Sequence, residues 1–364
     1  MTKSVASASG SAKTNWHERA EACHLAWCAA ATSRVAIDTE TTGTAYADVA
    51  FCVTVAWGDE GHYLELADEA SFEVAASILQ DAQEWVFHNP KFDIAKMIQA
   101  GLLTRDEVSW DRIHDTEAIA HLLDENQVKK LKTLAMTHVG WDDTIEVEYK
   151  SKEKRGQTYL VSREKYELDA AKLAAKKALG LSSVKDVRYD MLPREVIIPY
   201  AVADAVMTWR LFEKLYPYLR AKDQALQDLY DRERKLSLVL MDAELAGMRV
   251  DTQYVDKMVK KMGSDLWILE TKIENIVDEP WKDHHTYIMP AFEKVGIKLE
   301  NTRKETLREI DHPLAELIRE WRRQKKLRDY FLAIQREQVD GILHPNFRQH
   351  GTKTGRMSSG EVDE

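Results

Sequence analysis

The stretch from Val35 to Gly43 constrains the fold of this chain more than any other. It begins with apolar residues and ends in a Thr/Gly turn, which is typical of a buried strand leaving a sheet. Because side chains alternate between the two faces of a strand, we expect Asp38 and Glu40 to point to the same side. Two adjacent carboxylates stay ionised together only with a cation between them. Two solvated surface acids are the alternative, which the apolar residues before Asp38 make less favourable.

The length and charge of the chain limit what it can be. Its 364 residues suffice for two domains or one large domain. A net charge of -10 argues against a generic basic nucleic-acid coat, although local basic patches can hold phosphates. The cysteines are few and lack metal-ligand spacing, which predicts a reducing, cytosolic compartment. No apolar run approaches the length that a membrane requires, and Met1 to Lys13 predict a disordered lead-in without a signal peptide.

Strands followed by helices indicate an α/β layer arrangement in the first part of the chain. We expect helices at 16–31, 72–80, 94–100, 117–123 and 193–219, and strands at 51–57, 61–66 and 85–88. The basic, polar run over 149–177 has two interpretations, and we favour an exposed loop over a flank that contacts nucleic-acid phosphates. After residue 223 the pattern is helical, until the Gly- and Ser-containing stretch 344–359.

Four acids stand out because each follows an apolar segment that would be buried: Asp38, Glu40, Asp93 and Asp204. Tyr200 precedes Asp204 by four residues, which places both on one face of a helix. Buried acids need compensation, and an oxygen-ligated Mg²⁺ or Mn²⁺ ion would supply it.

These residues resemble a known family. Asp38-x-Glu40, Asn89-x-x-x-Asp93 and Tyr200-x-x-x-Asp204, in this order, look like the three motifs of the DEDDy 3′–5′ exonucleases, as found in the proofreading domain of family A (Pol I-like) DNA polymerases. The resemblance implies an RNase H-like (DnaQ-like) α/β exonuclease domain, a mixed sheet flanked by helices.

The resemblance also implies a catalytic mechanism and roles for the residues. Asp38, Glu40, Asp93 and Asp204 would hold two Mg²⁺ or Mn²⁺ ions about 4 Å apart, with Tyr200 and Glu40 at the attacking water. The 3′-terminal nucleotides of the substrate would be held by Thr41, His88, Asn89 and Phe92. Two of these have structural alternatives: His88 as a polar strand end, which we prefer, and Phe92 as a core residue.

The resemblance continues into the polymerase region. Residues 236–251 resemble its opening, Arg322-x-x-x-Lys326-Leu327 resembles the thumb-to-palm segment, and 344–359 is similar to the Thr-x-Thr-Gly-Arg-x-Ser-Ser signature. It implies three regions: a tail and lead-in helix over 1–33, an exonuclease domain over 34–222, and a mainly helical, thumb-like, incomplete polymerase region over 223–364. The residues expected to contact a primer–template duplex are Arg322, Lys326, Thr352, Thr354 and Arg356. The alternative for the basic helix around Arg322 is a solvated face.

The family's palm and fingers motifs do not follow, since the sequence stops five residues after Ser359. We therefore expect no nucleotide incorporation by this chain alone, and we expect 344–364 to lack packing partners. The chain would be a fragment, or the N-terminal half of a split polymerase of the phage type whose second chain supplies palm and fingers.

The predicted function is a metal-dependent, proofreading-type 3′–5′ exonuclease that acts on single-stranded DNA ends during DNA replication. Two alternatives remain open. One is a non-catalytic duplex-binding subunit of a split polymerase. The other is a stand-alone RNA-trimming DEDDy nuclease, which the polymerase-like region after residue 223 disfavours.

Overall fold

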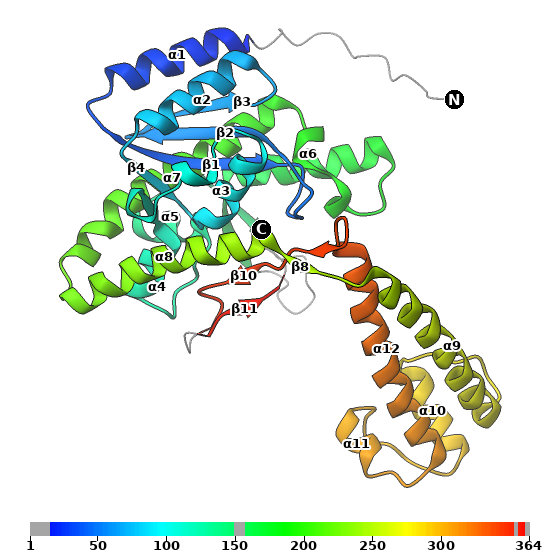
Figure 1. The fold of residues 1–364 in the computed structure, drawn as a ribbon. Coiled ribbons are helices and arrows are strands. Elements are labelled where there is room, and N and C mark those ends of the chain that lie inside the picture. Colours follow the sequence, from blue (N-terminus) through cyan, green and yellow to red (C-terminus); the bar gives the residue numbers. More distant parts are fainter. Residues whose placement is uncertain (1–14, 149–156, 353–355, 361–364) are drawn as a thin grey trace, which may run out of the picture. The chain divides into compact units, whose positions relative to one another are not determined.

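The computed structural model describes residues 15–148, 157–352 and 356–360 (Figure 1). The chain divides into two compact units: unit 1 comprises 1–245 and 346–364, and unit 2 comprises 246–345. The expected disordered lead-in and the beginning of the basic run, 149–156, lie outside the described residues. Among the residues that are described, no helix has the length and apolar character needed to cross a membrane.

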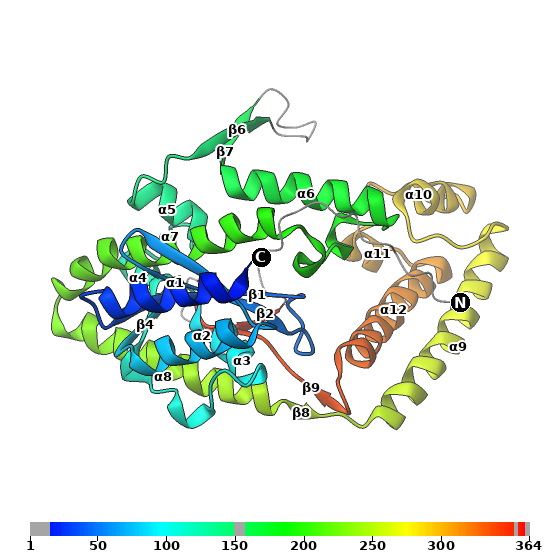
Figure 2. The same cartoon turned by 90° about the horizontal axis from the view of Figure 1, so that it is seen from above.

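A five-stranded mixed sheet forms the centre of unit 1 in the order β3-β2-β1-β4-β5; Figure 2 labels its strands β1, β2 and β4. Antiparallel pairing joins β1 to β2 and β2 to β3, whereas β1–β4 and β4–β5 are parallel. The strands are β1 (Arg34–Thr41), β2 (Ala50–Trp57), β3 (Glu60–Glu65), β4 (Glu84–Phe87) and β5 (Ile113–Asp115). The predicted α/β class, with a mixed sheet flanked by helices, is therefore confirmed.

Alternation along β1 sends successive side chains into two different cores. Val35 and Ile37 join the cluster with residues of α1 (Trp16–Ala29), α2 (Glu69–Asp81) and α3 (Pro90–Gln99). Ala36 joins the cluster with residues of α4 (Thr116–Leu123), α5 (Leu131–His138), α7 (Arg194–Arg220) and α8 (Gln224–Ala246). Because the period of a strand is two, Asp38 and Glu40 continue the α7 side, and Thr39 continues the α3 side.

Side-chain caps fix where two of the helices begin. Asp68 accepts a hydrogen bond from the Ser71 N–H (2.9 Å) at the start of α2, and Asp115 accepts one from the Glu117 N–H (2.8 Å) at the start of α4. Such caps contribute about 1 kcal/mol each. The turn between β4 and α3 is tight, because Asn89 has a left-handed backbone (φ 71°) directly before Pro90 in the first turn. The helix that begins at this turn places Asp93 next to Thr39 of β1, the central strand of the sheet.

The prediction of an exposed loop over 149–177 is wrong for its described part. Residues after the gap form β7 (Thr158–Ser162), paired antiparallel with β6 (Thr144–Glu148), and then α6 (Arg163–Leu179). The many charged residues of α6 make its apolar face hard to recognise in the sequence. Leu168 is fully buried on that face and shares a cluster with Ile197 and Ala201 of α7.

Unit 2 is mainly helical, as predicted. Its long helices α9 (Thr252–Val277) and α12 (Pro313–Glu337) pack along each other. The core includes Phe292, Leu314 and Trp321. A short antiparallel pair, β8 (Met248–Arg249) with β9 (Ile342–Leu343), joins its two ends. Unit 2 also contains α10 (His285–Lys294) and α11 (Lys304–Arg308). In unit 1 there are also the 3₁₀ turns η1 (Arg105–Glu107), η2 (Trp110–Arg112), η4 (Val184–Asp186) and η5 (Tyr189–Met191).

The division into compact units differs from the expected boundary at residue 222. Nearly all of α8 belongs to unit 1, and so does the C-terminal hairpin of β10 (Phe347–Arg348) and β11 (Ser358–Ser359).

Residues 344–364 were expected to lack packing partners. This expectation is wrong for the described residues from 346 on, which contact other parts of unit 1. Lys91 Nζ donates to the Phe347 carbonyl (2.6 Å) and pairs with Glu244 Oε1 (2.5 Å), which also accepts from the Phe347 N–H (2.6 Å). We call Lys91, Glu244 and Phe347 the hairpin clamp.

Candidate functional site

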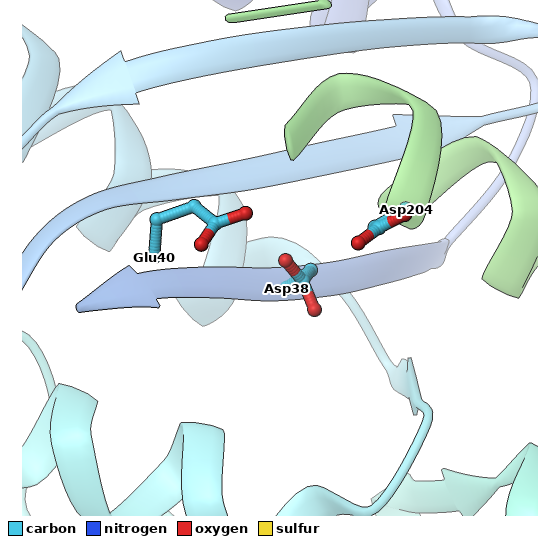
Figure 3. Close-up of side chains that lie close together, drawn as sticks. All are labelled: Asp38, Glu40 and Asp204. Atoms are coloured by element: carbon cyan, nitrogen blue, oxygen red, sulfur yellow. The ribbon is translucent and has the colours of Figure 1, made fainter. Parts of the chain in front are cut away.

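Three carboxylates meet where α7 packs on β1. Asp38 and Glu40 project from β1, and Asp204 projects from α7 toward them (Figure 3). One oxygen of each lies within 4.8 Å of the others, and Glu40 and Asp204 are buried. The hydroxyl of Thr54 on β2 donates to the Ala201 carbonyl of α7 (3.1 Å), which ties the helix to the sheet. The predicted shared orientation of Asp38 and Glu40 is confirmed.

Asp93 reaches the site from the opposite side of β1. Its Oδ1 accepts hydrogen bonds from the Thr39 backbone N–H (2.9 Å) and hydroxyl (2.6 Å). It is absent from the group of three described acids whose oxygens lie within 4.8 Å. Burial raises the pKa of Asp93 to about 7 against the lowering effect of the Thr39 hydrogen bonds. The assignment of Asp93 as a direct metal ligand stays a prediction.

The site carries more negative charge than its surroundings can stabilise. Burial raises the pKa of Asp38 well above its usual range, and the charges of Asp93, Glu40 and Asp204 raise it further. Lys132 opposes them. A divalent cation would remove this repulsion, and a donor set made only of carboxylate oxygens suits Mg²⁺ or Mn²⁺. The residues therefore fit the predicted ions.

Lys132 is a member of the site that sequence reasoning missed. It lies in the first turn of α5, and its Nζ is 2.5 Å and 2.7 Å from the two carboxylate oxygens of Asp204. The same atom lies 4.1 Å from the ring centroid of Tyr200. In the sequence, Lys132 follows Lys129 and Lys130 and looks like part of an ordinary basic run.

Tyr200 lies one helical turn before Asp204, as predicted, and is 9% exposed. Its ring packs edge-on against Tyr189, with the centroids 5.8 Å apart. Burial and the charge of Asp204 raise the pKa of Tyr200 well above its usual value. Its phenol therefore keeps the proton at neutral pH and can both donate and accept a hydrogen bond.

The acids open into a cleft of about 910 Å³ in unit 1, which also contains all the residues expected to hold 3′-terminal nucleotides. Phe92 is half-buried in it, and Lys96 Nζ lies 5.7 Å from its ring centroid. The Thr41 hydroxyl donates to the Gly43 carbonyl (2.7 Å). The N–H of Asn89 donates to Asp115 (3.1 Å). A direct contact of these residues with a nucleotide stays a prediction.

His88 sits in the same cleft, but both its ring nitrogens have protein partners. Nδ1 lies 2.8 Å from the hydroxyl of Thr116, and Nε2 lies 2.8 Å from the Lys129 carbonyl oxygen. Burial lowers the pKa of His88 to about 4, so the ring is neutral. These contacts agree with the interpretation of His88 as a polar strand end.

The lining of the cleft also carries many cations. Beyond Lys132, the lining includes Lys129, Lys130, Lys165, Lys172, Lys185 and Arg188. Residues 346–351 of the C-terminal hairpin complete another part of the lining. Lysines and arginines in the same cleft as the carboxylates can attract a phosphate backbone, while the carboxylates can bind a metal.

The residues expected to contact duplex DNA are not gathered in this cleft. Arg322 lies in unit 2, where its guanidinium donates to Asp283 (2.7 and 2.9 Å) and to the Thr302 carbonyl (2.6 Å). Lys326, one turn later, is exposed. In unit 1, the Thr352 hydroxyl donates to the carbonyl of Arg356 (2.6 Å), whose side chain is exposed. Thr354 lies outside the described residues. The duplex contact stays a prediction.

The sequence matches the family model described as 3′–5′ exonuclease, from DNA polymerase A, over residues 15–220. It is 31% identical to a DNA polymerase I of Chloroflexus aurantiacus over 48% of this chain and 21% of that protein. Identity to a DNA-directed DNA polymerase of Pseudomonas phage M6 is 30%, over 47% of this chain and 27% of that one. The DNA polymerase DpoZ of Salmonella phage PMBT28 is 24% identical over 90% of this chain and 52% of its own length.

The chain thus spans between 21% and 52% of the length of these relatives. Among solved structures, it is similar to the POL domain of Pol1 from M. smegmatis in complex with DNA primer-template and dNTP, with a TM-score of 0.58. That likeness covers 90% of this chain and 51% of the solved chain at 17% sequence identity, so it concerns the fold.

Proposed function

Since the chain belongs to the 3′–5′ exonuclease family of DNA polymerase A, we propose that it removes nucleotides from the 3′ ends of DNA by metal-dependent hydrolysis of the phosphodiester bond. The observation that carries this proposal is the meeting of Asp38, Glu40 and Asp204 within 4.8 Å in a cleft that is also lined by lysines and arginines. Carboxylates this close and this buried are stabilised by a divalent ion.

Asp38, Glu40 and Asp204 would hold the metal, with Asp93 beside them, fixed by Thr39. Bound Mg²⁺ or Mn²⁺ supplies a nucleophilic hydroxide at neutral pH and stabilises the departing 3′ oxygen. The protonated phenol of Tyr200 would orient the attacking water through its hydroxyl, while Glu40 would accept a hydrogen bond from it. The raised pKa of Tyr200 keeps that hydroxyl intact at neutral pH.

The substrate we propose is a single-stranded 3′ end of DNA. Phe92 offers a ring in the cleft for base stacking, and the lysines and arginines of the lining suit a phosphate backbone. Relatives of this chain are named as DNA polymerases, which supports DNA instead of RNA as its substrate. We further propose that a primer–template duplex contacts Lys326, Arg356 and Arg322. We also propose that the protein acts in the cytosol. Residues 1–364 should not incorporate nucleotides, because they contain no palm motifs.

The test is hydrolysis of a 5′-labelled single-stranded oligonucleotide with Mg²⁺ or Mn²⁺. We expect a ladder shortened from the 3′ end, which EDTA abolishes. Asp38→Ala and Asp204→Asn should each lose several orders of magnitude in rate, because each removes a carboxylate that would bind the metal. Tyr200→Phe should lose less, since it spares the metal.

The matched control is Asp59→Asn, which removes an exposed carboxylate paired with Arg210 and should leave the rate unchanged. A near-normal rate for Asp38→Ala would refute the metal assignment. Internal cleavage products, or products that shorten from the 5′ end, would refute the direction of digestion.

A further inference from the structure

The ammonium of Lys132 occupies a position in the acidic site that the proposed mechanism does not use. Its Nζ contacts both oxygens of Asp204, at 2.5 and 2.7 Å. The two side chains are 19% and 11% exposed, so the pair is largely shielded from water. The salt bridge is therefore built into the site and differs from an exposed pair, whose geometry fluctuates.

The backbone of Lys132 is held by packing as well. Leu131 and Ala135 of α5 share a cluster with Ala203 and Met207 of α7, which lie one residue before and three residues after Asp204. The ring of Tyr200 lies 4.1 Å from Nζ and provides a second, favourable contact for the cation. Lys132 is thus fixed to the same helix face that presents Asp204 to the other acids.

A lysine ammonium is a compact, fully charged donor, and here it uses both oxygens that Asp204 could offer to a metal. A carboxylate has lone pairs beyond these two bonds, but a divalent ion bound to Asp204 would lie close to a positive charge. A divalent and a monovalent cation about 5 Å apart repel each other enough to change an equilibrium roughly tenfold or more, even with water-like screening.

We propose that Lys132 is a positioning residue that competes with the divalent ion for Asp204 and thereby sets the metal affinity of the exonuclease site. In the absence of metal, Lys132 neutralises part of the carboxylate cluster and fixes the orientation of Asp204. Metal binding requires Asp204 to exchange this partner or to share it. This inference rests on the proposed function, because it presumes a divalent ion at Asp38, Glu40 and Asp204.

The test is direct measurement of Mn²⁺ binding by titration calorimetry on the full chain. Lys132→Met should bind Mn²⁺ about tenfold more tightly than the wild type, and its metal-free melting temperature should fall because three acids lose their cation. Lys132→Arg keeps the charge and should stay near the wild-type affinity. The matched control is Lys165→Met, which removes a cleft-lining lysine that pairs with Asp169 instead of Asp204.

The outcomes separate the two proposals. Equal or weaker Mn²⁺ binding by Lys132→Met, with binding by the wild type intact, would overturn the competition and leave the proposed function standing. An equal gain in Lys165→Met would also overturn it, because a general loss of positive charge would then explain the effect. If neither the wild type nor Lys132→Met binds Mn²⁺, both proposals fail together. Circular dichroism on each variant confirms that it is folded.

Discussion

Replacing Lys91 by Met should destabilise unit 1 severely. Lys91 contacts Glu244 and Phe347, which are distant from it in the sequence. Its side chain is 7% exposed and pairs with Glu244, which is 17% exposed. The substitution keeps an unbranched apolar side chain of nearly the same length, with sulfur in place of Cδ, and removes the ammonium. What remains is a largely buried carboxylate without its cation, next to a Phe347 carbonyl that has lost a donor.

The geometry sets the magnitude. At 2.5 Å and an effective dielectric constant of about 20, the Coulomb attraction is roughly 6–7 kcal/mol. Desolvation of the two charges offsets part of this, and breaking a buried pair from one side typically costs about 3–5 kcal/mol. We expect the free energy of unfolding to fall by about that amount, a large share of the roughly 5–15 kcal/mol available to a domain.

Urea unfolding, combined with hydrogen exchange read by mass spectrometry, localises the effect. Amides of 346–351 should lose protection in Lys91→Met, whereas amides of β2 should lose protection only through global unfolding. Lys91→Met/Glu244→Gln should recover about 2 kcal/mol, because the buried negative charge that lost its ammonium is removed together with it. As a control, Lys261→Met breaks an exposed pair with Asp265 and should cost under about 0.5 kcal/mol. A loss below about 1 kcal/mol in Lys91→Met, with hairpin protection unchanged, would refute the reasoning.

Three further expectations concern other parts of the chain. Lys326→Ala should reduce the salt slope of duplex binding by about one unit. Arg322→Ala should do the same and should also lower the melting temperature of unit 2, because Arg322 donates a hydrogen bond to Asp283. An unchanged slope in both variants would mean that this helix only presents a solvated face. Burial, and then neighbouring positive charge, lowers the pKa of His350 to about 3. Stability present above pH 6.5 should therefore fall as the pH drops from 6.5 toward 3, by up to about 1.4 kcal/mol per pH unit, and His350→Gln should flatten this dependence in urea titrations. Gly247→Ala should lower the melting temperature of unit 2, because φ is +63° and a Cβ would meet Ile342 at 2.5 Å.

Local periodicity sufficed to predict the part of the site that lies on single elements. Alternation along one strand put Asp38 and Glu40 on the same side, and the four-residue helical spacing put Tyr200 beside Asp204. Apolar residues before each acid predicted burial. Strands followed by helices predicted the α/β layers, whereas the mixed sheet was an expectation from the family resemblance.

Contacts between distant segments could not be predicted in this way. Lys132 meets Asp204 across 72 positions of sequence, and nothing in a run of lysines distinguishes the one that will be buried against a carboxylate. Thr39 appeared only as the residue between two acids, yet it faces the other side of the strand and holds Asp93. The separation of Asp93 from the three clustered acids follows from this parity, which the motif spacing does not reveal.

The hairpin clamp has a consequence for how the protein is made. Unit 1 is interrupted after residue 245 and resumes at 346, so the whole of unit 2 is translated before Phe347. At about 5–20 residues per second, the ribosome needs roughly 5–20 s for that segment. During this interval Lys91 and Glu244 already exist but Phe347 does not, and the wall of the cleft formed by 346–351 is missing. A nascent chain of this protein should therefore acquire its sheet and three-acid cluster first, and its complete cleft only when the hairpin emerges.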